Sequence, residues 1–312
     1  MTEARTGIRE VMRLTGLLLA IALATSRFGL LGHELVGHGG TALLVGGRVT
    51  DVQLFWFAGG WIRYQFASPA GTAALLAIAM GGVAIEAVCG AALWTLVRGD
   101  TLGKRLLRAI GATFVVHATW YFATGAWHGY GDGQLLYREL GSARFPVAIA
   151  AGALTCVCGF FAAREIVGPL VATASRRWMF VIAALLAGSI HAGLAVGEVE
   201  LRQDTTYADV MQPERERVVD RDLERWAVYE RKGNVTEEQR AAEHARLEKV
   251  HHTFPFAWVL AACAVIAILA GAWRSLARAT ERLPITNGLI ARATIYALIA
   301  ITAVITIDLI TR

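Results

Sequence analysis

Charged residues are scarce in this chain, and their scarcity excludes a soluble globular protein. Asp, Glu, Lys and Arg make up 18% of its 312 residues, while hydrophobic residues make up 55%. Soluble domains carry about 25% charged residues, so this composition is typical of an integral membrane protein. The formal net charge of +5 does not indicate a nucleic-acid partner, because many of the basic residues fall in short loops between apolar runs.

Cysteine is also rare, and its positions exclude a Cys-x-x-Cys metal or redox motif. All four cysteines fall inside apolar runs, so we interpret them as packing residues that carry no information about the cellular compartment. They are Cys89, Cys156, Cys158 and Cys263.

Seven apolar runs are long enough to cross a bilayer, which takes roughly 20 residues. They cover residues 14–31, 70–97, 106–126, 145–171, 178–196, 254–272 and 289–310. The first run lacks a signal-peptide cleavage pattern, so we interpret it as a retained span. We therefore predict an all-α polytopic membrane protein in contact with membrane lipids.

The basic residues of the loops predict the orientation of the spans. Every second loop is basic, which indicates a cytoplasmic N-terminus in a bacterial cytoplasmic membrane. The residues concerned are Arg5, Arg9, Arg13, Arg98, Lys104, Arg105, Arg108, Arg176, Arg177, Arg274, Arg278 and Arg282. On this orientation the hydrophilic segment 199–253 and the C-terminus lie outside the cytoplasm.

The end of the first span contains the run His33-Glu34-Leu35-Val36-Gly37-His38. Two imidazoles and a carboxylate beside hydrocarbon are costly unless they are paired, hydrogen-bonded or bound to a metal. In the zinc-protease motif His-Glu-x-x-His the histidines are four residues apart, about 40° around an α-helix. Here they are five apart, about 140° on a regular helix. Either the helix bulges, which Gly37 would ease, or the ligand set differs from that motif.

Residues 45–61 change in character. They are rich in β-branched and aromatic residues with Gly-Gly pairs near both ends, which predicts one or two short strands with turns. A short sheet here would offer a free edge to an extended peptide. A plain surface loop is the alternative.

These motifs together resemble the core of the site-2 protease family, the intramembrane zinc metalloproteases. The His-Glu run continues as Gly39-Gly40-Thr41-Ala42 into a Gly-Gly-x-Val strand, and Gly131-Asp132-Gly133 is similar to the later Asp-Gly of the family. The run 80–86 resembles the Gly-Pro-x-x-Asn motif, with Glu86 in the Asn position. The resemblance covers roughly the first 140 residues. It departs from the pattern in the extra residue between the histidines, in Glu86, and in the missing prolines before Asp132.

The resemblance implies zinc-dependent hydrolysis of peptide bonds in membrane or membrane-associated proteins. The implied zinc ligands are His33, His38 and Asp132, with a fourth position left for water. Glu34 would then be the general base that takes the proton of the water and passes it to the leaving amine.

Other interpretations remain open. Glu34 and His38 share a face of an undistorted helix, and the spacings of His117, His128 and Asp132 fit one helical face if that helix continues. With His191, such ligands suit a non-haem iron or two-metal enzyme for a lipophilic or small substrate. A non-catalytic metal-binding or transport protein is a further alternative, as is a hydrogen-bonded polar cluster without metal.

Two further buried charges are candidates for the same site. Arg27 lies two turns before Glu34 and would pair with it, bind an anionic substrate end, or extend to the membrane interface. Glu86 is interpreted as a partner of a metal ligand, a proton carrier, or a neutral structural residue.

The hydrophilic segment predicts a helical hairpin outside the membrane. One helix starts at Pro213, the turn covers residues 232–234, and a capping box of Thr236 and Gln239 opens a second helix to about residue 252. Val219, Leu223 and Trp226 would form its apolar contacts. The hairpin is either a lid over the site or a solvated spacer. The predicted units are a metal-binding core 1–140, added spans 141–198, the hairpin 199–253, and a C-terminal helix pair 254–312.

Overall fold

The computed structural model describes residues 2–167, 177–231, 233–252, 254–276 and 285–311. Within this part of the chain seven helical segments are long and apolar enough to span a membrane, as predicted. They are Gly7–Leu44, Thr72–Leu96, Leu102–His128, Gly133–Ile166, Arg177–Arg202, Phe256–Ser275 and Asn287–Thr311. The end of the predicted span 145–171 lies outside the described residues, as do Arg176, Lys232, Arg278 and Arg282.

The first part of the chain forms the elements that carry the predicted site. They are α1 (Thr2–Leu31), the π-helix η1 (Gly32–Gly40), α2 (Thr41–Leu44), strands β1 (Arg48–Leu54) and β2 (Gly60–Gln65), α3 (Thr72–Leu96), α4 (Leu102–His128) and α5 (Gly133–Leu140). The remaining elements are η2 (Gly141–Ala143), α6 (Arg144–Ala162), η3 (Ala163–Val167), α8 (Arg177–Arg202), α9 (Thr205–Met211), α10 (Glu214–Arg225), η4 (Trp226–Glu230), α11 (Glu237–Val250), α12 (Phe256–Leu276) and α13 (Asn287–Thr311).

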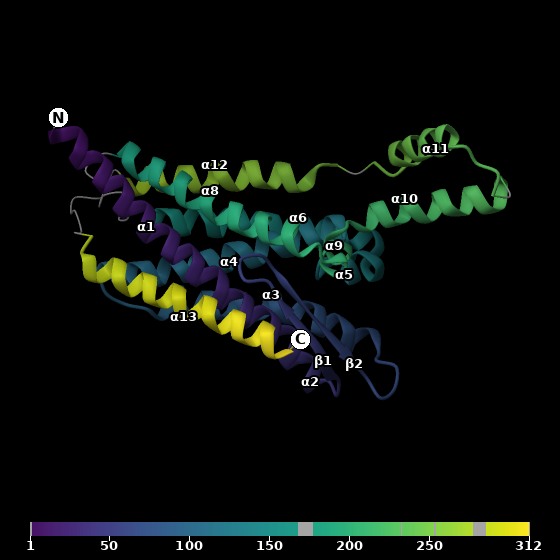
Figure 1. Ribbon diagram of the computed structural model, residues 1–312, viewed down its shortest axis with the longest axis horizontal. Coiled ribbons are helices and arrows are strands. Elements are labelled where there is room, and N and C mark those ends of the chain that lie inside the picture. The colour runs from purple at the N-terminus through teal and green to yellow at the C-terminus, as the bar shows by residue number, and fades with distance from the viewer. Residues whose placement is uncertain (1, 168–176, 232, 253, 277–284, 312) are drawn as a thin grey trace.

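The long helices form two groups that meet at the site. Helix α1 packs against α8 and α13, while α4 packs between α3 and α6, and α12 packs on α6. The π-helix η1, which continues α1, packs against α3 and so joins the two groups. Figure 1 shows α1 and α13 side by side along the length of the molecule.

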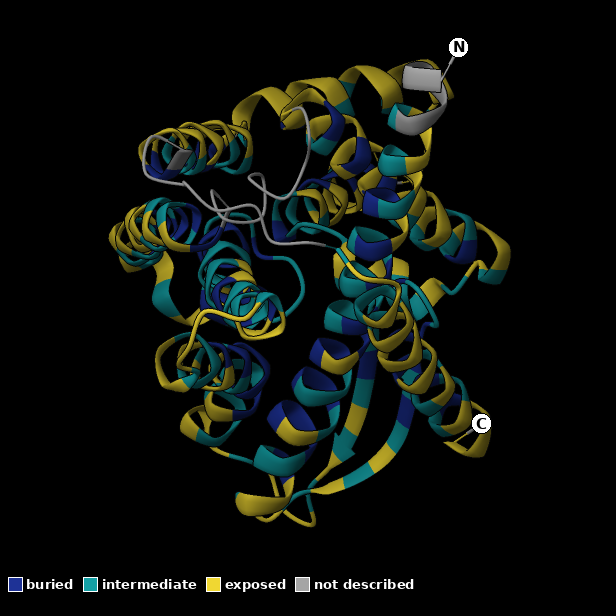
Figure 2. Cartoon of the chain, turned by 90° about the vertical axis from the view of Figure 1, so that its left-hand side faces the viewer, coloured by how far each residue is buried: buried dark blue, intermediate teal, exposed yellow. Residues whose placement is uncertain are grey.

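Large apolar side chains cover the outer faces of the helices. Leu185, Ile266 and Leu298 are more than half exposed, and Figure 2 shows exposed residues along the outward sides of the helix ribbons. Extended apolar surfaces of this kind are unfavourable in water. Lipid contact therefore accounts for them in a multi-pass membrane protein.

The segment after the first span is a two-stranded antiparallel sheet, which confirms the predicted β segment. Strand β1 pairs with β2 from Arg48 opposite Gln65 to Leu54 opposite Gly60. The sheet packs against η1 and α13. Among the described residues it has two strands, so the second edge of β2 has no strand partner there. The surface-loop alternative is wrong.

The predicted helical hairpin is present in the hydrophilic segment. Pro213 caps α10, and Thr236 and Gln239 form the capping box of α11, with both reciprocal hydrogen bonds. Val219, Leu223 and Leu247 form a small buried cluster, against which Trp226 packs. In Figure 1 this hairpin projects away from the spans.

Candidate metal centre

The π-helix η1 brings the two histidines of the His-Glu run together. In a π-helix the backbone hydrogen bonds join residues five apart, so residues with that spacing lie above one another. His33 and His38 have this spacing, and their ring centroids are 4.8 Å apart. Of the two alternatives that the sequence left open, the helix bulge is therefore the one that the structure contains.

Gly37 allows this π-helix to approach α3 closely. A Cβ at Gly37 would lie 2.5 Å from the Cα of Gly82 and 2.7 Å from the carbonyl oxygen of Gly81. A Cβ at Gly82 would in turn meet the ring of His33. Gly37, Gly81 and Gly82 therefore let the backbones of η1 and α3 touch beside His33.

The turn between α4 and α5 supplies Asp132. Helix α4 ends at His128 because Gly129 adopts the left-handed conformation with φ of 74°, which favours glycine. Gly131 is also left-handed, with φ of 53°. The resulting tight turn directs Asp132 back toward η1.

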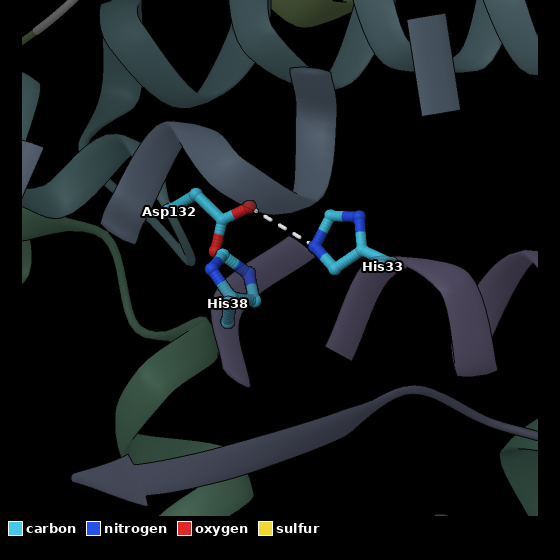
Figure 3. Close-up of side chains that lie close together, drawn as sticks. All are labelled: His33, His38 and Asp132. Carbon is cyan, nitrogen blue, oxygen red and sulfur yellow. Dashed lines mark ion pairs between the residues drawn. The ribbon is translucent and has the colours of Figure 1, made fainter. Parts of the chain in front are cut away.

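The Asp132 carboxylate faces both imidazoles. Its Oδ2 is 3.1 Å from Nε2 of His33, and its Oδ1 is 3.1 Å from Nε2 of His38. Figure 3 shows the three side chains converging from η1 and the α4–α5 turn. Burial alone would raise the pKa of the Asp132 carboxyl, but the neighbouring His38 and His33 hold that pKa well below its ordinary value.

This cluster fits a metal ion. One ligand atom from each of His33, His38 and Asp132 lies within 4.8 Å of the other two. The Oδ2 atom of Asp132 is buried, and its 3.1 Å contact with Nε2 of His33 lacks the geometry of a hydrogen bond in the described structure, which disfavours a cluster satisfied by hydrogen bonds alone. Two imidazole nitrogens and a carboxylate oxygen are a donor set that suits zinc or non-haem iron.

Outer partners orient the two imidazoles. The Nδ1 atom of His38 is 2.7 Å from the carbonyl oxygen of Ile78, an acceptor, so Nδ1 carries the proton and Nε2 is left as the ligand atom. The Oε1 atom of Glu86 lies 3.7 Å from Nδ1 of His33, while its Oε2 lies 2.9 Å from Nδ1 of His117. Glu86 thus links a candidate ligand to a second histidine.

Glu34 lies beside the cluster without a partner of its own. The residue is 6% exposed, and its side chain makes no hydrogen bond or ion pair with another described residue. It lines the same cavity as the three candidate ligands. A carboxylate held in this way is available to a bound water or substrate.

Three of the predicted additional residues have other contacts. His128 accepts a hydrogen bond from the backbone N–H of Ala257, His191 bonds to Ser26, and Arg27 donates to the carbonyl groups of Phe55 and Ala58. The expected helical face shared by His117, His128 and Asp132 is wrong, because α4 ends at His128. Pairing with Glu34 was one of three interpretations of Arg27, and the described contacts of Arg27 are instead those two carbonyl groups.

A cavity of about 980 Å³ opens beside the cluster. Its metal end is lined by Glu34 and by β2, including Gly60 and Trp61, and it continues between apolar side chains of α1, α3 and α4. Helix α9 closes one side, where the carbonyl of Val210 accepts from Gly131 N–H at 2.9 Å. Residues of the α10–α11 hairpin are absent from the described lining, so α9 covers the cavity and the hairpin does not.

Tyr121 also belongs to this site, although it was not predicted from the sequence. Its ring stacks on His117, with centroids 5.9 Å apart, and meets the ring of His33 edge-on at 6.0 Å. The available signal was spacing, because residues 117 and 121 are four apart on one helix face. A tyrosine inside an apolar span needs a polar partner for its hydroxyl.

No protein-family model, curated protein or solved structure matches the chain. The resemblance to the site-2 protease family therefore stays a prediction based on motifs. A multi-pass membrane protein with a buried His-His-Asp cluster is what the geometry supports directly.

Proposed function

We propose that this protein is a membrane-embedded zinc-dependent peptidase that cleaves membrane or membrane-associated proteins. The observation that carries the proposal is the placement of Glu34 beside His33, His38 and Asp132 in one buried cavity. Three ligands plus an adjacent unpaired carboxylate are the protein groups that metal-assisted peptide hydrolysis requires.

In this proposal three side chains would hold the metal and a fourth would transfer a proton. His33, His38 and Asp132 would hold zinc, which supplies a Lewis acid with one position open to water or substrate. Glu34 accepts a proton from the attacking water and returns it to the leaving amine as the peptide bond breaks. The burial of Glu34 keeps this proton transfer away from bulk solvent.

The open edge of β2 supports an extended peptide as the substrate. A strand edge offers a row of backbone N–H and C=O groups to which another chain can add. Gly60 begins this strand, and a Cβ placed there would lie 3.4 Å from Cγ of Glu34. A peptide on this edge would pass next to the general base.

Replacement of Glu34 tests the proposal. Glu34→Gln is expected to keep its zinc and to lose at least about 100-fold in cleavage of dye-labelled casein, since general-base catalysis contributes about that much or more. The exposed Glu139 provides the matched control, and Glu139→Gln should cleave normally. Unchanged cleavage by Glu34→Gln would exclude Glu34 as the base.

A non-haem iron enzyme is the second candidate. Two histidines and one carboxylate with open positions are the ligand set of many iron-dependent oxygenases. The apolar part of the cavity between α1, α3 and α4 suits a lipophilic substrate. Iron in place of zinc in the purified protein, together with no peptide cleavage, would favour this candidate over the peptidase.

A further inference from the structure

The loop between β1 and β2 is held by a carboxylate from a distant helix. The side chain of Glu198, on α8, accepts the backbone N–H groups of Trp56 at 2.6 Å, Phe57 at 2.5 Å and Ala58 at 3.2 Å. Glu198 is 8% exposed. One carboxylate thus satisfies three consecutive backbone donors of a loop about 140 residues earlier in the chain.

Three other charged residues complete this network, which we call the loop clamp. Arg27 donates to the carbonyl groups of Phe55 at 2.8 Å and Ala58 at 2.7 Å. Arg202 pairs with Glu198 at 2.7 Å and with Asp308 at 3.2 Å. Asp308 accepts the backbone N–H of Leu54 at 3.3 Å and the indole N–H of Trp56 at 3.1 Å. The clamp therefore joins α1, α8 and α13 to one loop.

Balanced charge explains how the loop clamp survives at this depth. Isolated buried charges cost several kcal/mol each, but here two cations face two anions, and backbone carbonyl groups accept further hydrogen bonds from both arginines. Charge-assisted hydrogen bonds have narrow geometry and are stronger than neutral ones. Such a network fixes the loop in one position more tightly than apolar packing would.

The other side of this loop faces the metal cavity. Phe57, Ala58 and Gly59 line the cavity and lead directly into β2. Because β2 starts next to Glu34, any movement of the loop changes the gap between the strand edge and the general base. The loop clamp therefore controls the width of the cavity at the point where chemistry is expected.

We propose that Glu198 is a positioning residue, which holds the loop 55–59 so that β2 presents its edge to substrate at the correct distance from Glu34. This inference rests on the proposed peptidase function for its kinetic consequence, while its structural part stands independently of that reaction. It also gives the spans α8 and α13 a role in the site.

Amide hydrogen exchange tests the structural part directly. In Glu198→Gln one carboxylate oxygen becomes an NH₂ group, which cannot accept a hydrogen bond. The amides of residues 56–58 should then exchange at least about tenfold faster, because hydrogen bonds to a charged acceptor stabilise by roughly that factor or more. Zinc content should not change. The control is Glu200→Gln, an exposed residue on the same helix, which should exchange like the unaltered protein.

Kinetics on dye-labelled casein separates positioning from a merely structural role. For Glu198→Gln we expect KM to rise at least about fivefold with kcat within about twofold, the pattern of lost binding. A purely structural defect would lower the active fraction and leave KM unchanged. If neither the variant nor the unaltered protein cleaves casein, the peptidase function fails, but the exchange result still decides the role of Glu198.

A second variant covers a failure of Glu198→Gln to fold. Asp308→Asn should speed exchange at Leu54 while the amides of Phe57 and Ala58, which contact Glu198, stay protected. Unchanged exchange at residues 56–58 in folded Glu198→Gln, or at Leu54 in folded Asp308→Asn, would overturn the proposal, as would exchange that rises equally throughout the sheet.

Discussion

At the scale of the residue, Gly37 determines how closely the π-helix η1, which carries His33 and His38, can approach α3. We expect Gly37→Ala to lower the free energy of unfolding by about 1–3 kcal/mol, because its methyl group would overlap the backbone of α3. This loss exceeds the gain of up to about 1 kcal/mol from the better helix propensity of alanine. Thermal unfolding in detergent measures the difference.

Gly32→Ala is the matched control for this substitution. Gly32 lies in the same π-helix, but a Cβ there would have nothing within 4 Å in the described chain. That variant should be as stable as the unaltered protein or slightly more stable. Equal destabilisation by both substitutions would show that the close approach of η1 and α3 does not matter.

Glu86 is expected to affect zinc binding, because it lies behind the proposed ligand His33. Its carboxylate lies 3.7 Å from Nδ1 of His33, and outer partners of metal-bound histidines typically contribute 10–100-fold to metal affinity. We expect Glu86→Gln to weaken zinc binding by about tenfold in competition with a fluorescent chelator. If Glu86→Gln binds zinc as tightly as the unaltered protein, Glu86 acts as a partner of His117 and does not support His33 as a metal ligand.

At the scale of the element, the π-helix η1 brings His33 and His38 together, although they are one residue further apart than the histidines of the motif His-Glu-x-x-His. Removal of Val36, which is 58% exposed, would restore the spacing His-Glu-x-x-His. One residue fewer turns a π-bulge back into α-helix without rotating the segments on either side. We therefore expect the protein lacking Val36 to retain zinc, as measured by metal analysis.

A deletion elsewhere in the same span provides the comparison. Loss of Ala22 from the regular helix α1 would rotate everything before it by about 100° relative to η1 and should abolish stable folding or zinc binding. If removal of Val36 is as harmful as removal of Ala22, then η1 does not act as an inserted residue in an α-helix.

At the scale of the whole molecule, the orientation in the membrane decides which side of the bilayer the metal cavity faces. Arg13 donates to the carbonyl of Ile285 and to the side chain of Asn287, so the start of α1 lies next to the start of α13. Helix α5, which directly follows Asp132, and α9 lie toward the opposite end (Figure 1). The alternation of basic loops predicts that the end near Arg13 faces the cytoplasm.

Cysteine labelling tests that orientation. In a variant without the four native cysteines, Lys249→Cys should react with a membrane-impermeant maleimide in spheroplasts, whereas Lys104→Cys should react only after lysis. Both positions are exposed in the structure. The opposite labelling pattern would place the hairpin and the metal cavity on the cytoplasmic side.

Much of the fold could be predicted because bilayer thickness sets the length of each span and the turn residues mark their ends. The capping box at Thr236 and the β segment were also visible in local sequence. The π-helix remained one of two alternatives, since it depends on the contact of Gly37 with Gly82. The carbonyl partners of Arg27 were not predicted, because they depend on long-range contacts. The shared face of His117, His128 and Asp132 depended on a longer helix, which the left-handed Gly129 ends.

The central claim is that His33, His38 and Asp132 bind one catalytic zinc ion. Metal analysis of the purified protein tests it most directly, with His38→Ala as the comparison. We expect about one equivalent of zinc per chain, as in a single three-ligand site, and a large loss of zinc in the variant. A stoichiometric iron content, or a folded protein that binds no metal when zinc is supplied, would contradict the account.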